Sequence, residues 1–304
     1  MAKETEIKLR VTPATLDALR EHPLLNERRT GDWQSGTLYN QYFDTIDRDL
    51  ARAKVALRIR RDGDTYIQTL KSRGQSVAGL SERNEWDWYL EGDALDLSLL
   101  DDSCWPASLG MLDRSTIAPV FTTHFQRTKA LLSWQRGDET VEVEAALDSG
   151  AVEAGTDQEP ICELELEVRQ GPAAAVLELA AALAADLPLM PCDISKAERG
   201  YRLTDPGSYA LRPSLAAWTA ETSVDDVIAG AGWQLLGQVQ RLAEQFRHTG
   251  QFKLFRDMTA ALGELRALFG VFDMGLPRSA AQPFLAPLDQ LLAAFRPLVL
   301  AGWA

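Results

Sequence analysis

The sequence predicts an α+β protein in which an eight-stranded antiparallel β-sheet, closed into a tunnel with flanking helices, precedes an all-α helical bundle. Three observations predict this class. Short segments before residue 204 alternate between polar and apolar side chains, which is the period of β-strands. Apolar residues after position 214 recur at steps of three or four, which is the period of helices. The segment 204–213 holds two prolines and a glycine and is typical of a linker.

The period-two segments predict the strands of the first domain. Short helical patterns lie near 13–20 and 172–186, and the second is rich in Ala and Leu. Many short strands with few helices favour an antiparallel sheet that is closed or nearly closed. The expected strands are 4–11, 39–43, 54–61, 65–71, 83–90, 123–131, 140–148 and 161–169.

The second part of the chain predicts three or more amphipathic helices. Their apolar residues run from Ile228 to Phe246, from Phe255 to Phe269 and from Phe284 to Leu298. Gly-Gln at 250–251 and Gly-Leu-Pro at 275–277 separate them. A length of 304 residues is that of about two domains. We therefore expect domains at 1–204 and 215–304, joined by a linker at 205–214.

The composition of the chain limits the classes of partner that the protein is expected to bind. A net charge of −13 argues against binding to a nucleic-acid backbone. The three cysteines are scattered, with no C-x-x-C pair, which indicates a reducing compartment and no zinc ribbon. The first residues lack the apolar core of a signal peptide, and we expect no stretch of about 18 apolar residues able to span a bilayer. The sequence thus predicts a soluble cytoplasmic protein that binds neither membrane nor nucleic acid.

Charged side chains in the expected strands form rows, because residues i, i+2 and i+4 of a strand share one face. On a single strand, a row that faces solvent explains such a pattern without any function. Rows of one sign are nevertheless unfavourable unless they face the opposite charge. The rows are Glu4, Glu6 and Lys8; Arg58 and Arg60; Arg83, Glu85 and Asp87; Arg127 and Lys129; Glu142, Glu144 and Asp148; and Glu163, Glu165 and Glu167.

Taken together, the rows favour a tunnel whose inner wall is charged. The apolar rows then face outward, and we expect the two helical patches and the second domain to cover them. Arginine and lysine bind polyanions, and clustered glutamates bind hard divalent cations. A phosphate chain chelated by a metal ion satisfies both requirements. Because the rows contain no His or Cys, they favour Mg²⁺ or Mn²⁺ over Zn²⁺.

Several short motifs follow one another along residues 1–204. They are Glu4-Thr-Glu-Ile-Lys8, Tyr42-Phe-Asp44, Leu57-Arg-Ile-Arg60, Leu70-Lys71, Arg83-x-Glu85, Arg127, Glu142-x-Glu144, Asp148-Ser-Gly150, Glu163-x-Glu-x-Glu167 and Ser195-Lys-Ala-Glu-Arg-Gly-Tyr201. As a set, they resemble the CYTH superfamily, also called triphosphate tunnel metalloenzymes. The chain looks most similar to bacterial inorganic triphosphatases in which a CYTH domain precedes a helical CHAD domain.

This resemblance implies an eight-stranded tunnel that hydrolyses a triphosphate with a divalent metal, and it implies roles for individual residues. The implied catalytic residues are Glu4, Glu6, Lys8 and Lys71. The implied metal ligands are Glu4, Glu6, Glu163, Glu165 and Glu167. The implied substrate-binding residues are Lys8, Arg58, Arg60, Lys71, Arg83, Arg127, Lys196 and Arg199. The implied supporting residues are Glu85, Glu142, Glu144 and Asp148.

The resulting hypothesis is a metal-dependent inorganic triphosphatase, in which metal-activated water attacks tripolyphosphate and releases pyrophosphate and orthophosphate. The same fold also implies alternatives: a thiamine or nucleoside triphosphatase, or a class IV adenylate cyclase. A third class is a module that binds polyphosphate without catalysis.

The helical region resembles a CHAD domain only in part. About 90 residues remain after the linker, roughly half of a complete CHAD domain. A small basic patch could bind polyphosphate, but a solvated helix face explains it better. The patch consists of Arg247, His248, Lys253 and Arg256.

Overall fold

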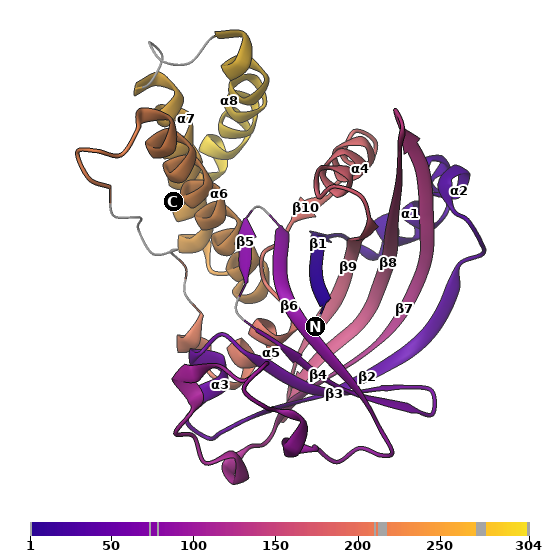
Figure 1. The fold of residues 1–304 in the computed structure, drawn as a ribbon. Helices are drawn as coiled ribbons and strands as arrows, with labels where there is room; N and C mark the ends of the chain where they lie inside the picture. The colour runs from indigo at the N-terminus through magenta and orange to yellow at the C-terminus, as the bar shows by residue number, and fades with distance from the viewer. Residues whose placement is uncertain are drawn as a thin grey trace. The chain divides into compact units, whose positions relative to one another are not determined.

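The computed structural model describes residues 2–72, 74–77, 79–209, 211, 218–271 and 278–302. The chain divides into two compact units, Met1–Tyr209 and Ala210–Ala304 (Figure 1). Much of the expected linker at 205–214 lies outside the described residues; its first part forms a 3₁₀ turn at Pro206–Ser208.

The first unit is a closed antiparallel β-barrel, as the sequence predicts. Its eight strands follow the order β1-β9-β8-β7-β2-β3-β4-β6, and β6 pairs back to β1 to close the ring. The short strands β5 and β10 extend the sheet at its edges. The strands are β1 (Ala2–Arg10), β2 (Gln34–Asp44), β3 (Ala56–Asp62), β4 (Thr65–Lys71), β5 (Gln75–Val77), β6 (Leu80–Leu90), β7 (Ala118–Arg136), β8 (Glu139–Ala154), β9 (Asp157–Gln170) and β10 (Met190–Pro191).

Several strands are longer than their period-two segments. β8 continues from the expected end at position 148 to Ala154. Ala145, Ala146, Leu147 and Asp148 are all buried, so both faces of the strand are covered in its middle. A strand buried on both faces loses the alternation that marks a half-buried one, and its sequence therefore does not show its full extent.

The apolar rows face outward, as expected, and helices of the same unit cover them. α1 (Pro13–Arg20), α2 (Pro23–Arg28) and α4 (Ala174–Ala184) pack on the outer face of β1, β7, β8 and β9, where Leu19, Leu164 and Leu183 are fully buried (Figure 1). On the far side, the segment 95–117 covers β3, β4 and β6, and it includes 3₁₀ turns at Leu97–Leu99, Ala107–Leu109 and Arg114–Thr116. This segment supplies cover that we had expected from the second domain.

One end of the barrel is filled by α5 (Lys196–Thr204) and an aromatic cluster. Tyr42 stacks on Phe121 at a ring-centroid distance of 4.7 Å, and Tyr201 of α5 meets Phe121 edge-on. Gly200 lies so close to this ring that a Cβ there would be 2.2 Å from it. Any other residue at 200 would therefore push α5 away from the barrel. A short helix, α3 (Asp49–Arg52), follows β2.

The second unit contains three packed helices: α6 (Val224–Thr249), α7 (Phe252–Val271) and α8 (Arg278–Ala301). α6 ends at Gly250, which has a φ of 68° and forms a left-handed cap, so the first expected break is confirmed. The second break, at 275–277, lies outside the described residues. In the basic patch, Lys253 and Arg256 both pair with Asp257, which neutralises part of its charge.

α8 meets the length and composition of a membrane-spanning helix, which the sequence pattern did not lead us to expect. Residues Ser279–Ala301 form one helix with a mean hydropathy of 1.4, and only 6% of its most apolar window is buried. By length and composition alone this helix could span a bilayer. Polar residues, Gln282, Asp289, Gln290 and Arg296, interrupt its apolar residues, so the sequence contains no continuous apolar run of that length.

Candidate active site in the tunnel

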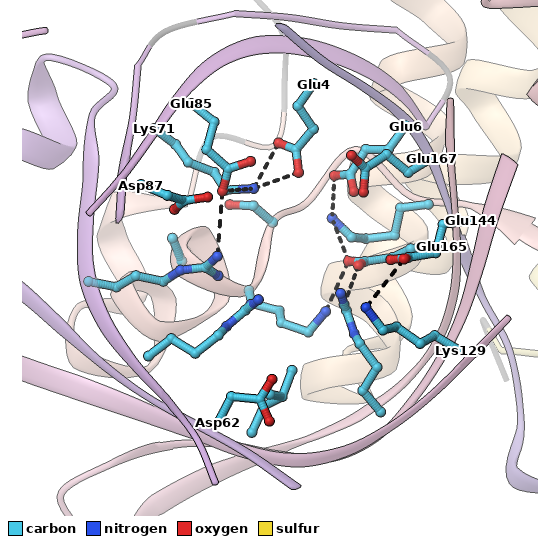
Figure 2. A pocket seen from close by; sticks show the side chains of 18 of the residues that line it. Glu4, Glu6, Asp62, Lys71, Glu85, Asp87, Lys129, Glu144, Glu165 and Glu167 are labelled. Atoms are coloured by element: carbon cyan, nitrogen blue, oxygen red, sulfur yellow. Dashed lines mark hydrogen bonds and ion pairs between the residues drawn. The ribbon is translucent and has the colours of Figure 1, made fainter. Parts of the chain in front are cut away.

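The barrel encloses a charged cavity of about 370 Å³ (Figure 2). Eight carboxylates and nine basic side chains line it. The carboxylates belong to Glu4, Glu6, Asp62, Glu85, Asp87, Glu144, Glu165 and Glu167, and the basic groups to Lys8, Arg58, Arg60, Lys71, Arg83, Arg127, Lys129, Arg169 and Lys196. Because the strands alternate, the same pattern that turns apolar residues outward brings these charges together inside.

The carboxylates gather on the wall formed by β1, β8 and β9. The register places Glu6 opposite Glu167 and Glu144 opposite Glu167, so three acidic side chains from three adjacent strands meet. Glu4 lies on β1 two residues from Glu6, and Lys71 of β4 contacts both of its carboxylate oxygens at 2.7 Å. Figure 2 shows Glu4, Glu6, Glu144 and Glu167 pointing into the cavity.

These carboxylates carry more negative charge than their neighbours neutralise. Burial raises the pKa of Glu167 to about 7; Glu4, Glu6 and Glu144 add to the rise, against the lowering effect of Arg169. Arg169 is the basic group that pairs with Glu167, at 2.7 Å. Burial is the largest cause of this rise and the neighbouring carboxylates add to it; a cation bound beside Glu167 would offset both effects.

Basic side chains gather on the opposite wall, formed by β2, β3 and β7. Burial lowers the pKa of Arg60 to about 10, and the positive charges of Arg58 and Arg127 lower it further. Arg58 lies 3.7 Å from Glu85, and among the described residues its buried Nε has no hydrogen-bond partner. This wall therefore has positive charge in excess, and it offers donors to an anion.

Lys196 projects from α5 into a trio of buried carboxylates at the closed end. Its Nζ lies 2.7 Å from Asp148 and 2.9 Å from Glu165, and it also contacts Glu163. The oxygens of the trio lie within 4.8 Å of one another, a spacing that could hold a metal ion. The ammonium group already fills that position, and Arg127 makes two hydrogen bonds to Asp148. The trio is therefore balanced by cationic side chains.

Behind this trio, Arg199 lies outside the cavity. It is fully buried and bonds Glu159 at 2.6 Å and Glu163 at 3.3 Å. Lys8 lies at the floor, 3.5 Å from both Glu6 and Glu165, and those carboxylates raise its pKa although burial alone would lower it. Glu142, the outermost of its row, does not line the cavity either.

Comparisons with known proteins agree with this geometry. Residues 2–201 match the CYTH domain. The chain belongs to the CYTH family. It is 31% identical over 203 residues to the inorganic triphosphatase of Haemophilus influenzae; the match covers 67% of this chain and 55% of that protein, so this chain spans about half the length of the relative.

Solved structures with a similar fold include a Hippeastrum protein described as having a dominant triphosphatase activity. It is 23% identical, covers 65% of this chain and 96% of its own, and has a TM-score of 0.47. The protein PH1819 of Pyrococcus horikoshii is 19% identical, with 64% and 97% coverage and a TM-score of 0.41.

Within this CYTH domain, the residues implied by the motifs mostly meet in one cavity. Glu163 and Asp148 do not line the cavity themselves, but both contact Lys196, which does. Arg199 and Glu142 also lie outside the lining. Sequence reasoning assigned no individual role to five charged or aromatic lining residues, although four of them share a strand face with residues that it chose. These five are Tyr42, Asp62, Asp87, Lys129 and Arg169.

The pKa of Glu167 predicts how cation binding to the CYTH domain depends on pH. Because this pKa lies at about 7, a cation bound there must displace a proton at lower pH. We expect the apparent affinity for Mg²⁺ to rise about tenfold per pH unit up to about pH 7 and then level off. Calorimetric titration between about pH 5.5 and about pH 8.5 measures this affinity. In Glu167→Gln, the rise of the affinity with pH should disappear. A rise of the affinity with pH that persists in this variant would show that another group releases the proton.

Proposed function

We propose that this CYTH protein is a metal-dependent inorganic triphosphatase that hydrolyses tripolyphosphate to pyrophosphate and orthophosphate. The observation that carries the proposal is the pair of opposed walls: Glu4, Glu6, Glu144, Glu165 and Glu167 line the cavity from β1, β8 and β9, and Arg58, Arg60, Arg127 and Lys129 line it from β3 and β7. A polyanion bound with a divalent cation supplies both missing charges. The similarity to the Haemophilus triphosphatase supports the same substrate class.

The donor set suits Mg²⁺ or Mn²⁺. Glu4, Glu6, Glu144 and Glu167 offer only carboxylate oxygens, the ligands that hard divalent cations prefer. The charge excess at Glu167 favours this group over the trio at Lys196, which an ammonium group already balances. When bound, the metal supplies charge neutralisation for phosphate oxygens and lowers the pKa of a water molecule.

The chain's own residues position the substrate. Phosphoryl transfer requires alignment and neutralisation of charge more than covalent help from the protein. Arg58, Arg60 and Arg127 offer guanidinium donors to the phosphates from one wall, while Lys71 lies between Glu4 and Glu85. In the reaction, the oxygen of water forms a bond to a terminal phosphorus as the bridging P–O bond breaks and the leaving pyrophosphate takes up its charge. Glu4 or Glu6, which line the cavity, would accept the proton that this water loses as its oxygen bonds to phosphorus.

The lining favours an inorganic substrate over an organic one. An organic group needs an aromatic or hydrogen-bonding surface on which to rest. Among the described residues that line the cavity, Tyr42 is the aromatic one, and it is 4% exposed at the closed end. A base or thiamine ring attached to the triphosphate would thus find no aromatic stacking partner in the cavity; Gln34 and Ser35 of the lining offer hydrogen-bonding groups.

An assay of phosphate release from tripolyphosphate with Mg²⁺ or Mn²⁺ tests the proposal. We expect release that EDTA abolishes, and slower release from ATP and from thiamine triphosphate. Formation of cyclic AMP and pyrophosphate from ATP without orthophosphate would assign a cyclase instead. Saturable binding of polyphosphate without any release would assign a binding module. A cytoplasmic location and polyphosphate binding by the helical unit stay predictions.

A further inference from the structure

Arg60 is held differently from the other two guanidinium groups of the basic wall. Arg58 and Arg127 each lie beside a carboxylate, at 3.7 Å and 2.7 Å. Within the part of the chain that the structure describes, Arg60 forms no ion pair, and its Nε donates to the amide oxygen of Asn40 at 2.9 Å. A phosphate that approaches Arg60 therefore meets a guanidinium group that is anchored but not neutralised.

Asn40 is itself anchored on its other side. Its Nδ2 donates to the hydroxyl oxygen of Thr123 at 2.8 Å. The register places Thr123 of β7 opposite Asn40 of β2, and Asn40 opposite Arg60 of β3, so the three side chains form one row across adjacent strands. Thr123 and Asn40 are fully buried, whereas Arg60 lines the cavity. The row thus runs from the buried wall to the site of the substrate.

The chemistry of the row determines which way the amide of Asn40 points. A guanidinium group can only donate hydrogen bonds, so Arg60 requires the amide oxygen. A hydroxyl group can accept, and Thr123 therefore keeps the amide nitrogen away from Arg60. Asparagine is also neutral. A carboxylate at the same place would form an ion pair with Arg60 and cancel the charge that the wall offers to a phosphate.

We propose that Asn40, held by Thr123, is a positioning residue that orients Arg60 towards the phosphates and leaves its positive charge available to them. This inference rests on the proposed function. Two effects follow from it. Removal of the Thr123 hydroxyl group should let the amide turn and should misorient Arg60. A carboxylate in place of Asn40 should keep the orientation of Arg60 but neutralise it.

A double-mutant cycle with Arg60→Gln tests the first effect through kcat/KM for tripolyphosphate with Mg²⁺. We expect Thr123→Val to lower kcat/KM about threefold to tenfold, because valine keeps the shape but cannot accept. Thr123→Ser keeps the hydroxyl group and should restore most of the activity. In the Arg60→Gln background, Thr123→Val should cost less than about twofold. An equal loss with and without the guanidinium group would overturn the proposal, since Thr123 would then act on the fold alone.

Asn40→Asp tests the second effect through binding. The readout is the dissociation constant for tripolyphosphate, measured by calorimetry in EDTA so that metal-dependent hydrolysis does not intervene. We expect this constant to rise at least about tenfold in Asn40→Asp. The control is Asn84→Asp, which makes the same change on β6 at a position that does not line the cavity, and it should leave the constant unchanged. Equal constants in wild type and Asn40→Asp, or an equal rise in the control, would overturn the neutral anchor.

The two proposals fail in different ways. A wild type that binds tripolyphosphate but releases no phosphate contradicts the proposed function, and the cycle of Thr123 and Arg60 variants, measured by dissociation constants, then tests the positioning role. A wild type that neither binds nor hydrolyses tripolyphosphate overturns both. Circular dichroism checks that each variant is folded; if Asn40→Asp does not fold, the Thr123 cycle decides.

Discussion

Glu6→Gln is expected to lower metal-dependent turnover of tripolyphosphate by at least about a hundredfold. Glu6 is 6% exposed, lies opposite Glu167 and adds to the negative charge that raises the pKa of Glu167. The amide keeps the shape of the side chain but removes one of the charges that would hold the cation. Phosphate release over a series of Mg²⁺ concentrations measures the effect, and added metal should restore only part of the loss.

The matched control for this variant is Glu82→Gln. Glu82 lies on β6, its side chain is 44% exposed, and it pairs with Lys3 outside the cavity. We expect this variant to keep wild-type turnover. Circular dichroism should show the same fold in both variants, because neither substitution changes side-chain volume. Wild-type turnover in Glu6→Gln would show that Glu6 does not hold the metal.

Lys196→Met is expected to lower the free energy of unfolding of the first unit by about 3–5 kcal/mol. The substitution leaves Asp148, Glu163 and Glu165 buried together without the ammonium group that contacts all three. In wild type, burial alone would raise the pKa of Glu163, but Lys196 and Lys8 lower it to about 2. Chemical denaturation followed by circular dichroism measures the loss.

The pH dependence of this loss has a definite sign. A carboxyl group with a lowered pKa stabilises the folded state above its ordinary pKa, near 4.5, and this contribution is lost as the pH falls towards 2. The difference in the free energy of unfolding between wild type and Lys196→Met should therefore be largest at neutral pH and decrease below about pH 4.5. Lys3→Met, at a side chain that is 63% exposed, should change stability by less than about 0.5 kcal/mol. Equal losses in both variants would contradict the buried network.

Period-two alternation was enough to predict the barrel and most of its charged lining. Glu4, Arg58 and Glu165 lie on strands that are far apart in the sequence, yet each could be assigned from its own strand to the face opposite the apolar row, and the rows taken together placed that face inside the tunnel. This works because the side-chain period of a strand is two, so one apolar face fixes the direction of the other. The resemblance to the CYTH family then linked the strands into one site.

The pairing of the charges could not be predicted in the same way. Nothing local in the sequence shows that Lys196, on a helix, enters a trio from β8 and β9, because such contacts depend on how α5 packs on Phe121. The outer cover at 95–117 was also missed, since its single 3₁₀ turns have no period.

The closure of the barrel has a consequence for biosynthesis. β1 pairs with β6 through residues 2–7 and with β9 through residues 6–10, so the first strand of the barrel to be synthesised cannot complete its pairing until β9 has been synthesised. Pairings of such high contact order form slowly, and an unpaired strand edge is exposed meanwhile. The strand that carries Glu4 and Glu6 is therefore completed only after Gln170 has emerged. A nascent chain acquires its basic wall first and its acidic wall last.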